Sequence, residues 1–129
     1  MNNTFLILLM VFLHIIDDYV LQGILASMKQ KSWWKQNAPD ELYKRDYIWA
    51  LIMHSFSWSF MIMLPIAYIM NFQPNGWFMV IFALNVFTHA ITDNAKANLH
   101  AINLWFDQII HICQIVITFV FMILMGGKY

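Results

Sequence analysis

The chain has 129 residues, of which 61% are hydrophobic and 11% are charged, and its mean hydropathy is +0.61. Soluble domains contain about 45–50% apolar and about 25% charged residues, so this composition excludes a soluble globular protein. Seven basic and seven acidic residues cancel, which excludes the basic surface of a nucleic-acid-binding protein, and one cysteine excludes an intramolecular disulfide. The sequence therefore predicts a small integral membrane protein with a single domain, residues 1–129.

Four apolar segments follow each other along the chain. No charged residue lies between Asp46 and Asp93, or between Asp107 and Lys128, and a helix needs about 20 apolar residues to cross a bilayer. The predicted spans are residues 4–26, 47–70, 77–93 and 104–125. They predict an all-α fold, an antiparallel bundle of four transmembrane helices.

The connection between the first two spans, residues 27–46, holds five of the seven basic residues, and a sixth is Lys96 in the third connection. Cytoplasmic loops are enriched in Lys and Arg, so we assign these connections to the cytoplasm and both termini to the outside, in a bacterial inner membrane. Adjacent Trp33 and Trp34 predict an amphipathic segment at the membrane surface. Pro39, within residues 37–41, predicts a helix start ahead of the second span.

Each span also carries ionisable residues that a helix surrounded by lipid does not tolerate. At 100° per residue they fall on one stripe of each helix, and four polar stripes are satisfied only when they face each other. The predicted directions of the spans place all of these stripes in the cytoplasmic half of the membrane. We therefore predict one cluster of metal-ligating residues, formed by His14, Asp18, His54, His89, Asp93, Asp107 and His111.

Three His–Asp pairs in this set are spaced four residues apart, which puts both side chains on one helix face. Imidazoles and carboxylates without a thiolate suit a divalent Zn, Mn or Fe ion, and the set is rich enough for two. Carboxylates inside a membrane need a counter-charge, and Lys96 is the only basic residue on any of these stripes. A metal ion would supply that charge. There are two alternatives to a metal site: a metal-free network of protonated histidines and carboxylates, or polar residues that serve only to pack the helices together.

The motifs also resemble a known family. They are H-x3-D-Y-x-L-Q from His14, H-x3-D-x2-K from His89 and D-Q-x2-H from Asp107, in this order over nearly the whole chain. The combination resembles an uncharacterised family of small bacterial and phage membrane proteins, a domain-of-unknown-function family, which implies a four-helix membrane fold and no particular activity. Paired His and Asp on membrane helices are similar, more loosely, to membrane-bound metal-dependent hydrolases, and this likeness implies hydrolysis.

The first functional hypothesis is thus a membrane-embedded metal-dependent hydrolase. A bound divalent ion would lower the pKa of its water toward about 7. Asp107 or Asp17 would act as the general base, while Lys96 and Gln108 would hold a phosphate or carbonyl oxygen. A site near the headgroups predicts a lipid-linked phosphate or ester as substrate, with the lipid bilayer, a homo-oligomer or a larger membrane complex as partners.

Two other functions use the same residues. One is a channel or carrier for protons or metal ions, and the other is an accessory membrane protein whose polar core is structural. An ion pathway needs polar residues that continue to the outer surface. The outward segments, residues 5–13, 61–68, 78–84 and 116–124, are apolar, with Thr118 almost the only polar inward group. This pattern favours a site that opens to the cytoplasm alone.

Overall fold

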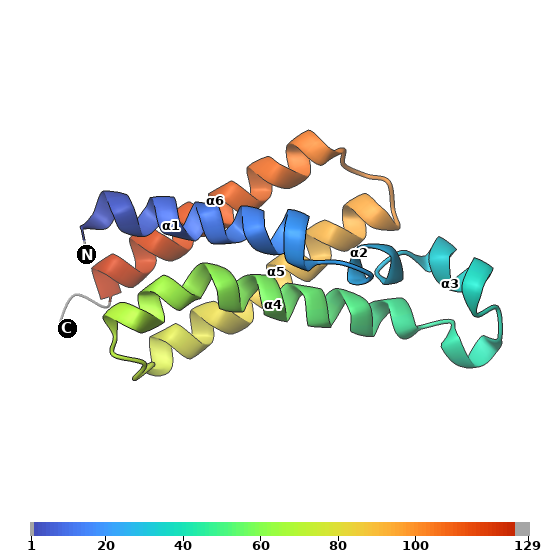
Figure 1. Cartoon of the computed structure of the whole chain (residues 1–129), viewed down its shortest axis with the longest axis horizontal. Coiled ribbons are helices and arrows are strands. Elements are labelled where there is room, and N and C mark those ends of the chain that lie inside the picture. Colours follow the sequence, from blue (N-terminus) through green and yellow to red (C-terminus); the bar gives the residue numbers. More distant parts are fainter. Residues whose placement is uncertain (1, 126–129) are drawn as a thin grey trace.

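The computed structural model describes residues 2–125, which are helical with connecting turns and contain no β-strand. Figure 1 shows four long helices lying side by side, with the short helix α3 beyond one end. In chain order the elements are α1 (Asn3–Ile16), the π-helical turn η1 (Asp17–Leu21), α2 (Leu25–Met28), α3 (Lys31–Asn37), the 3-10 turn η2 (Glu41–Tyr43), α4 (Asp46–Ile69), α5 (Gly76–Ala97) and α6 (Leu104–Met125).

Four helical stretches are long and apolar enough to cross a membrane, namely Asn3–Leu21, Glu41–Ile69, Gly76–Ala97 and Leu104–Leu124. Helices α4 and α6 coincide within one residue with the second and fourth predicted spans. Helix α5 continues past the predicted end at residue 93, because Asp93 and Lys96 contact side chains of the protein interior instead of ending the helix in water. The first predicted span, 4–26, needs a larger correction.

The first long helix ends at Leu21. It begins at Asn3, and the side chain of the preceding residue, Asn2, caps the helix by accepting a hydrogen bond of 2.7 Å from the Phe5 amide. Its last turn is the π-helical η1, and Gly23 follows with a φ of 51°, a left-handed conformation that glycine adopts without strain. The chain changes direction at Gly23, and the segment that follows packs against the ends of the long helices. Lys29 lies on this segment and is therefore buried, with an exposed fraction of 5%.

A tight turn joins α4 and α5, as the sequence predicts. Asn71 and Phe72 have φ values of 52° and 56° and reverse the chain direction after α4. The Asn75 side chain then accepts a hydrogen bond of 2.9 Å from the Phe78 amide and caps the start of α5. This turn lies at the end of the molecule that also holds the start of α1 (Figure 1).

The connection between the first two long helices is more ordered than a loop. The Trp34 indole donates a 2.6 Å hydrogen bond to the Met28 carbonyl and stacks on Tyr43 with ring centroids 6.4 Å apart. The helix start predicted at residues 37–41 agrees with the helical stretch that begins at Glu41, but the regular α-helix begins later. Glu41–Tyr43 forms only one 3-10 turn, and α4 begins at Asp46.

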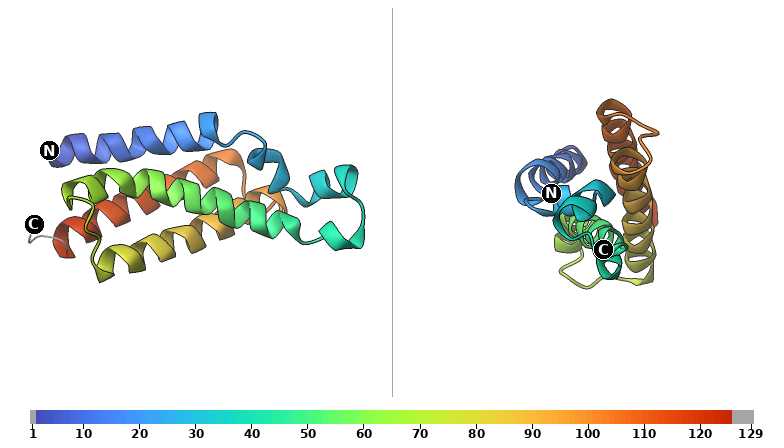
Figure 2. Two further views of the ribbon diagram at one scale, coloured as in Figure 1. Left: turned by 60° about the horizontal axis from the view of Figure 1, so that its bottom comes forward. Right: turned by 90° about the vertical axis from the view of Figure 1, so that its right-hand side faces the viewer.

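The four long helices enclose one interior. Helix α4 packs against α1 and α5, and α6 packs against the same two helices (Figure 2). Near the start of α1 this interior is apolar. Its buried members include Leu6, Met10, Ile62, Met63, Ile66, Ile115 and Met122. Toward the connection the interior becomes polar, and there the predicted site residues lie.

Candidate metal centre

The structure brings all seven predicted ligands together at the connection end of the long helices. They come from α1, η1, α4, α5 and α6. The Asp18 side chain is 6% exposed. The other six residues are at most 1% exposed: His14, His54, His89, Asp93, Asp107 and His111. The predicted convergence of four polar stripes is therefore present in the folded chain.

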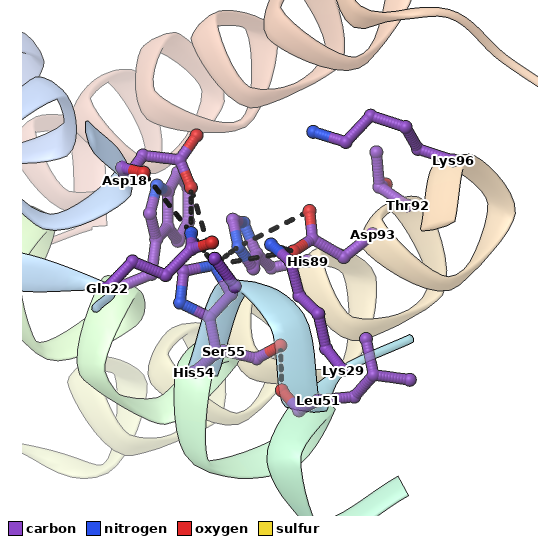
Figure 3. Close-up of polar contacts among 12 residues, drawn as sticks. Asp18, Gln22, Lys29, Leu51, His54, Ser55, His89, Thr92, Asp93 and Lys96 are labelled. Carbon is purple, nitrogen blue, oxygen red and sulfur yellow. Dashed lines mark hydrogen bonds and ion pairs between the residues drawn. The ribbon is translucent and has the colours of Figure 1, made fainter. Parts of the chain in front are cut away.

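One group of ligand-type atoms surrounds His54. Its Nε2 lies 3.4 Å from Asp18 Oδ1, 3.3 Å from Asp93 Oδ2 and 3.1 Å from His89 Nε2. Asp18, His54 and His89 each offer one ligand atom, all within 4.8 Å of one another. Figure 3 shows these side chains pointing toward one another from three helical segments.

A second group surrounds His111. Its Nε2 lies 3.3 Å from Asp93 Oδ1 and 3.5 Å from Asp107 Oδ1, and His89 Nε2 lies 3.8 Å from Asp93 Oδ1. Within residues 2–125, Asp93 Oδ1, Asp107 Oδ1 and His111 Nε2 are buried without a hydrogen-bond partner. Buried polar atoms without a partner are rare and costly, so two such carboxylate oxygens close to His111 Nε2 need a physical explanation.

The spacing of these atoms suits a shared cation. Two ligands that bind one zinc ion tetrahedrally at 2.0–2.2 Å stand about 3.4 Å apart. The separations of 3.3 and 3.5 Å around His111 match that value and exceed the mode of an N–H···O hydrogen bond, about 2.9 Å. The two groups share His89, and the two oxygens of Asp93 face one group each. They therefore form one continuous centre.

Two lysines reach this centre, although the sequence predicts only one. Lys96 Nζ contacts Asp107 Oδ2 at 2.5 Å, and Lys29 Nζ contacts Asp93 Oδ2 at 2.5 Å. The expectation that Lys96 is the sole basic neighbour is wrong, because the chain break at Gly23 carries Lys29 back into the interior. Figure 3 shows the Lys29 side chain extending to Asp93 from below.

Asn98, the residue that follows α5, holds the segment around Lys29 in place. Its Nδ2 donates to the Lys29 carbonyl at 3.0 Å, and its Oδ1 accepts from the Lys31 amide at 2.7 Å. Asn98 thereby clamps the backbone on both sides of Gln30. No helical periodicity connects Asn98 with Lys29, so the sequence held no signal for this contact.

The formal charges of the interior do not cancel. Its four carboxylates belong to Asp17, Asp18, Asp93 and Asp107. The ammonium groups of Lys29 and Lys96 offset two of them, so two negative charges remain when the imidazoles are neutral. One divalent cation, or two imidazolium ions, balances that charge. Two divalent cations would leave an excess of two positive charges, so the interior favours one ion over the two that the sequence allows.

His14 is predicted as a metal ligand, but the structure holds it in a hydrogen-bond chain. Trp58 Nε1 can only donate, and it lies 2.7 Å from His14 Nδ1, so this nitrogen is the acceptor. His14 Nε2 then donates to Gln108 Oε1 at 3.1 Å. Gln108 Nε2 in turn donates to Asp18 Oδ2 and Asp107 Oδ2, at 3.1 Å each. Both ring nitrogens of His14 are engaged, so it orients the carboxylates through Gln108 instead of binding the ion.

Asp17 is predicted as a candidate base and is buried, but its partner is Ser57. The Ser57 hydroxyl donates to Asp17 Oδ1 at 2.6 Å, and Asp17 is 1% exposed. Asp17 and Asp18 are neighbours on the π-helical turn, yet only Asp18 belongs to a ligand group. Asp107, with one oxygen free of hydrogen bonds and 3.5 Å from His111, is the better placed base.

Two further residues complete the centre without appearing among the predicted ligands. Gln22 Nε2 contacts Asp18 Oδ1 at 3.0 Å and His54 Nε2 at 3.1 Å. Its position four residues after Asp18 is a signal that the sequence contains. Trp58 stacks on His89 with ring centroids 4.2 Å apart, which fixes the orientation of that imidazole. Trp58 follows His54 by four residues and thus shares its helix face.

The polar interior ends on the side away from the connection. Asn85 Nδ2 donates to Thr118 Oγ1 at 2.8 Å, and Gln114 Nε2 donates to Asn85 Oδ1 at 3.2 Å. Beyond this network the interior contains apolar side chains such as Ile62 and Met122, at most 1% exposed. On the connection side, by contrast, the Lys96 side chain is 25% exposed. The polar interior therefore extends toward the connection end of the long helices and not toward the opposite end.

Comparison with known proteins finds no match: no family model, no curated protein and no solved structure is similar to this chain. The resemblance to a family of small bacterial and phage membrane proteins stays a prediction. The site geometry alone therefore supports the function proposed next.

Proposed function

We propose that the chain is an integral membrane protein whose four long helices form an antiparallel transmembrane bundle. All four are long and apolar enough to span, and large apolar side chains such as Phe12, Leu84, Phe87 and Val120 remain exposed on their outer faces. Lipid is the solvent that tolerates such a surface. The basic residues of the connection support an orientation in which the metal centre lies in the cytoplasmic half and both termini lie outside.

Within this bundle, one divalent ion binds at the group formed by His89, Asp93 and His111, and Asp18 and His54 form the adjoining group that shares His89. The observation that carries this assignment is the pair of buried, unpartnered atoms Asp93 Oδ1 and His111 Nε2, which lie 3.3 Å apart, at ligand spacing. Two uncompensated negative charges support it. Zn, Mn and Fe(II) all fit a mixed imidazole and carboxylate set.

The same centre supports hydrolysis of a phosphate or ester at the headgroup level. A bound divalent ion would supply Lewis acidity and an activated water. Asp107 is placed to accept the proton of that water, since its Oδ1 receives no hydrogen bond. Lys96, partly exposed at the connection end, is positioned to hold the substrate oxygen. Gln108, which the sequence predicts for the same role, already donates its two N–H groups to Asp18 and Asp107 and is left to orient these carboxylates. The proposed substrate class is a lipid-linked phosphate or carboxylic ester.

An ion pathway is the competing function, and the apolar interior ranks it second. Met10, Ile62, Met63 and Ile115 are all 0% exposed and separate the polar centre from the end at which α1 begins. A conducting path needs polar or hydrated positions across the whole span. The interior of this single chain offers them only as far as the network of Asn85 and Thr118.

Hydrolysis is tested with purified protein in lipid bicelles that contain candidate phosphate and ester lipids, with product release followed by phosphorus NMR and mass spectrometry. The proposal predicts turnover that is lost on chelation, restored by a divalent ion and abolished in Asp107→Asn. A matched control, His100→Asn, should keep full activity. His100 is exposed, and Asn tolerates its φ of 52°. Metal-dependent ion flux into vesicles without turnover would favour the ion pathway and overturn the hydrolase.

A further inference from the structure

The connection between η1 and α4 carries a second feature, separate from the metal centre. A cavity of about 630 Å³ lies between α3 and the first turn of α4. Its lining includes four basic and two aromatic residues, Lys31, Trp34, Lys35, Lys44, Arg45 and Tyr47. Most basic residues of the chain thus line one hollow.

The cavity carries an excess of positive charge. Two acidic residues, Asp40 and Glu41, also line it, and Glu41 pairs with Lys44 at 3.1 Å. Lys35 and Arg45 form no ion pair with a carboxylate within residues 2–125. Two unneutralised cationic side chains facing one hollow favour an anionic occupant.

The cavity also has an apolar margin. Leu42, which is 79% exposed, lines it together with Trp34 and Pro39. Exposed side chains of this kind are costly in water and favourable against acyl chains. An occupant with both a phosphate and a hydrocarbon part satisfies both features, whereas free phosphate satisfies only the charge.

The connection is held rigidly at the end of the bundle where the headgroups would lie. Asn98 bonds the Lys31 amide at 2.7 Å, and the Lys31 ammonium lies 4.9 Å from the centre of the Tyr47 ring. These contacts attach the cavity to α5 and α4. Figure 1 shows α3 beyond the connection end of the long helices.

We propose that this cavity binds the phosphate headgroup of an anionic phospholipid, with Lys35 and Arg45 as the main phosphate contacts. This binding goes beyond the proposed hydrolysis and uses no metal. A basic residue near an anionic headgroup contributes about five-fold in affinity, so the loss of both should weaken binding about 25-fold.

The test uses the full-length protein in neutral detergent after chelation, titrated with short-chain phosphatidic acid, short-chain phosphatidylcholine or inorganic phosphate. Binding is read from thermal stability and native mass spectrometry. The proposal predicts saturable binding of phosphatidic acid, weak binding of phosphatidylcholine and no effect of inorganic phosphate. Equal effects of inorganic phosphate and phosphatidic acid would overturn the assignment to a lipid.

Variants then test the cavity itself. Lys35→Ala with Arg45→Ala should show the 25-fold loss, while Lys35→Arg with Arg45→Lys keeps the charge and should retain binding. Asp40→Asn should bind more tightly, because it removes a negative charge from the lining. Unchanged binding in the double alanine variant would overturn the proposal. His111→Ala removes a ligand of the metal centre but leaves the Lys29–Asp93 ion pair intact, so it should bind the lipid normally, which separates a failure here from a failure of the metal centre.

Discussion

Replacement of Lys29 by Met removes the ammonium group that contacts Asp93 at 2.5 Å. The Lys29 and Asp93 side chains are 7% and 1% exposed, so the Asp93 carboxylate would lose its nearest cation without gaining water. Removal of one partner of a buried ion pair costs about 3–5 kcal/mol. We therefore expect Lys29→Met to lower the free energy of unfolding of the metal-free protein by that amount. Lys35→Met, at an exposed lysine of the same connection, should change it by less than about 0.5 kcal/mol.

A divalent ion should offset part of this loss. It places positive charge beside the same carboxylate, and a ligand that binds only the folded state stabilises it. The gain in stability on adding Zn²⁺ should therefore be larger for Lys29→Met than for the natural chain. In Lys29→Met with Asp93→Leu both charges are absent, so the metal-free protein should recover most of its stability but lose the response to Zn²⁺.

Reversible unfolding in mixed micelles, with chelator and with Zn²⁺, measures all of these differences. Equal stability of Lys29→Met and Lys35→Met in chelator would refute the reasoning. It would mean that Lys29 lies in water and that the connection does not fold back under the helices.

Three further predictions test other parts of the structure. Trp58→Phe leaves His14 Nδ1 without its hydrogen-bond donor, which should lower the free energy of unfolding by about 1–3 kcal/mol and the metal affinity by about 10–100-fold. Competition with a chelating dye measures the affinity, and an unchanged affinity would contradict the hydrogen-bond chain. Gly23→Ala places a side chain at a φ of 51° and should cost about 1–2 kcal/mol in chemical unfolding, whereas no loss would mean that the break is not fixed there. Lys35→Cys in a Cys113→Ser background should react with a membrane-impermeant reagent only after cells are opened, and labelling of intact cells would reverse the orientation.

The sequence predicts the long helices and the convergence of the cluster because both follow from local rules. A run of apolar residues has one stable conformation in lipid, and an ionisable residue on it has one favourable direction. For this reason even His54, the only histidine between Asp46 and His89 in a stretch without Asp, Glu, Lys or Arg, lies where its helix face predicts. The apolar interior beyond Thr118 follows from the same pattern.

The positions of Lys29 and His14 depend on long-range contacts that no local pattern contains. A lysine after an apolar span reads as a headgroup residue, and only the break at Gly23 and the Asn98 clamp place Lys29 at Asp93. His14 and Asp18 have ligand spacing, but Trp58 from α4 takes one nitrogen of His14 as its acceptor.

The metal content of the protein tests the central claim most directly. Protein purified without chelator should contain one Zn, Mn or Fe ion per chain by elemental analysis, and chelation should lower its melting temperature. Asp93→Asn and His111→Ala should lose the ion, whereas His100→Asn should keep it. A folded natural chain without a stoichiometric divalent ion, and with a melting temperature that chelator does not change, would contradict the metal centre.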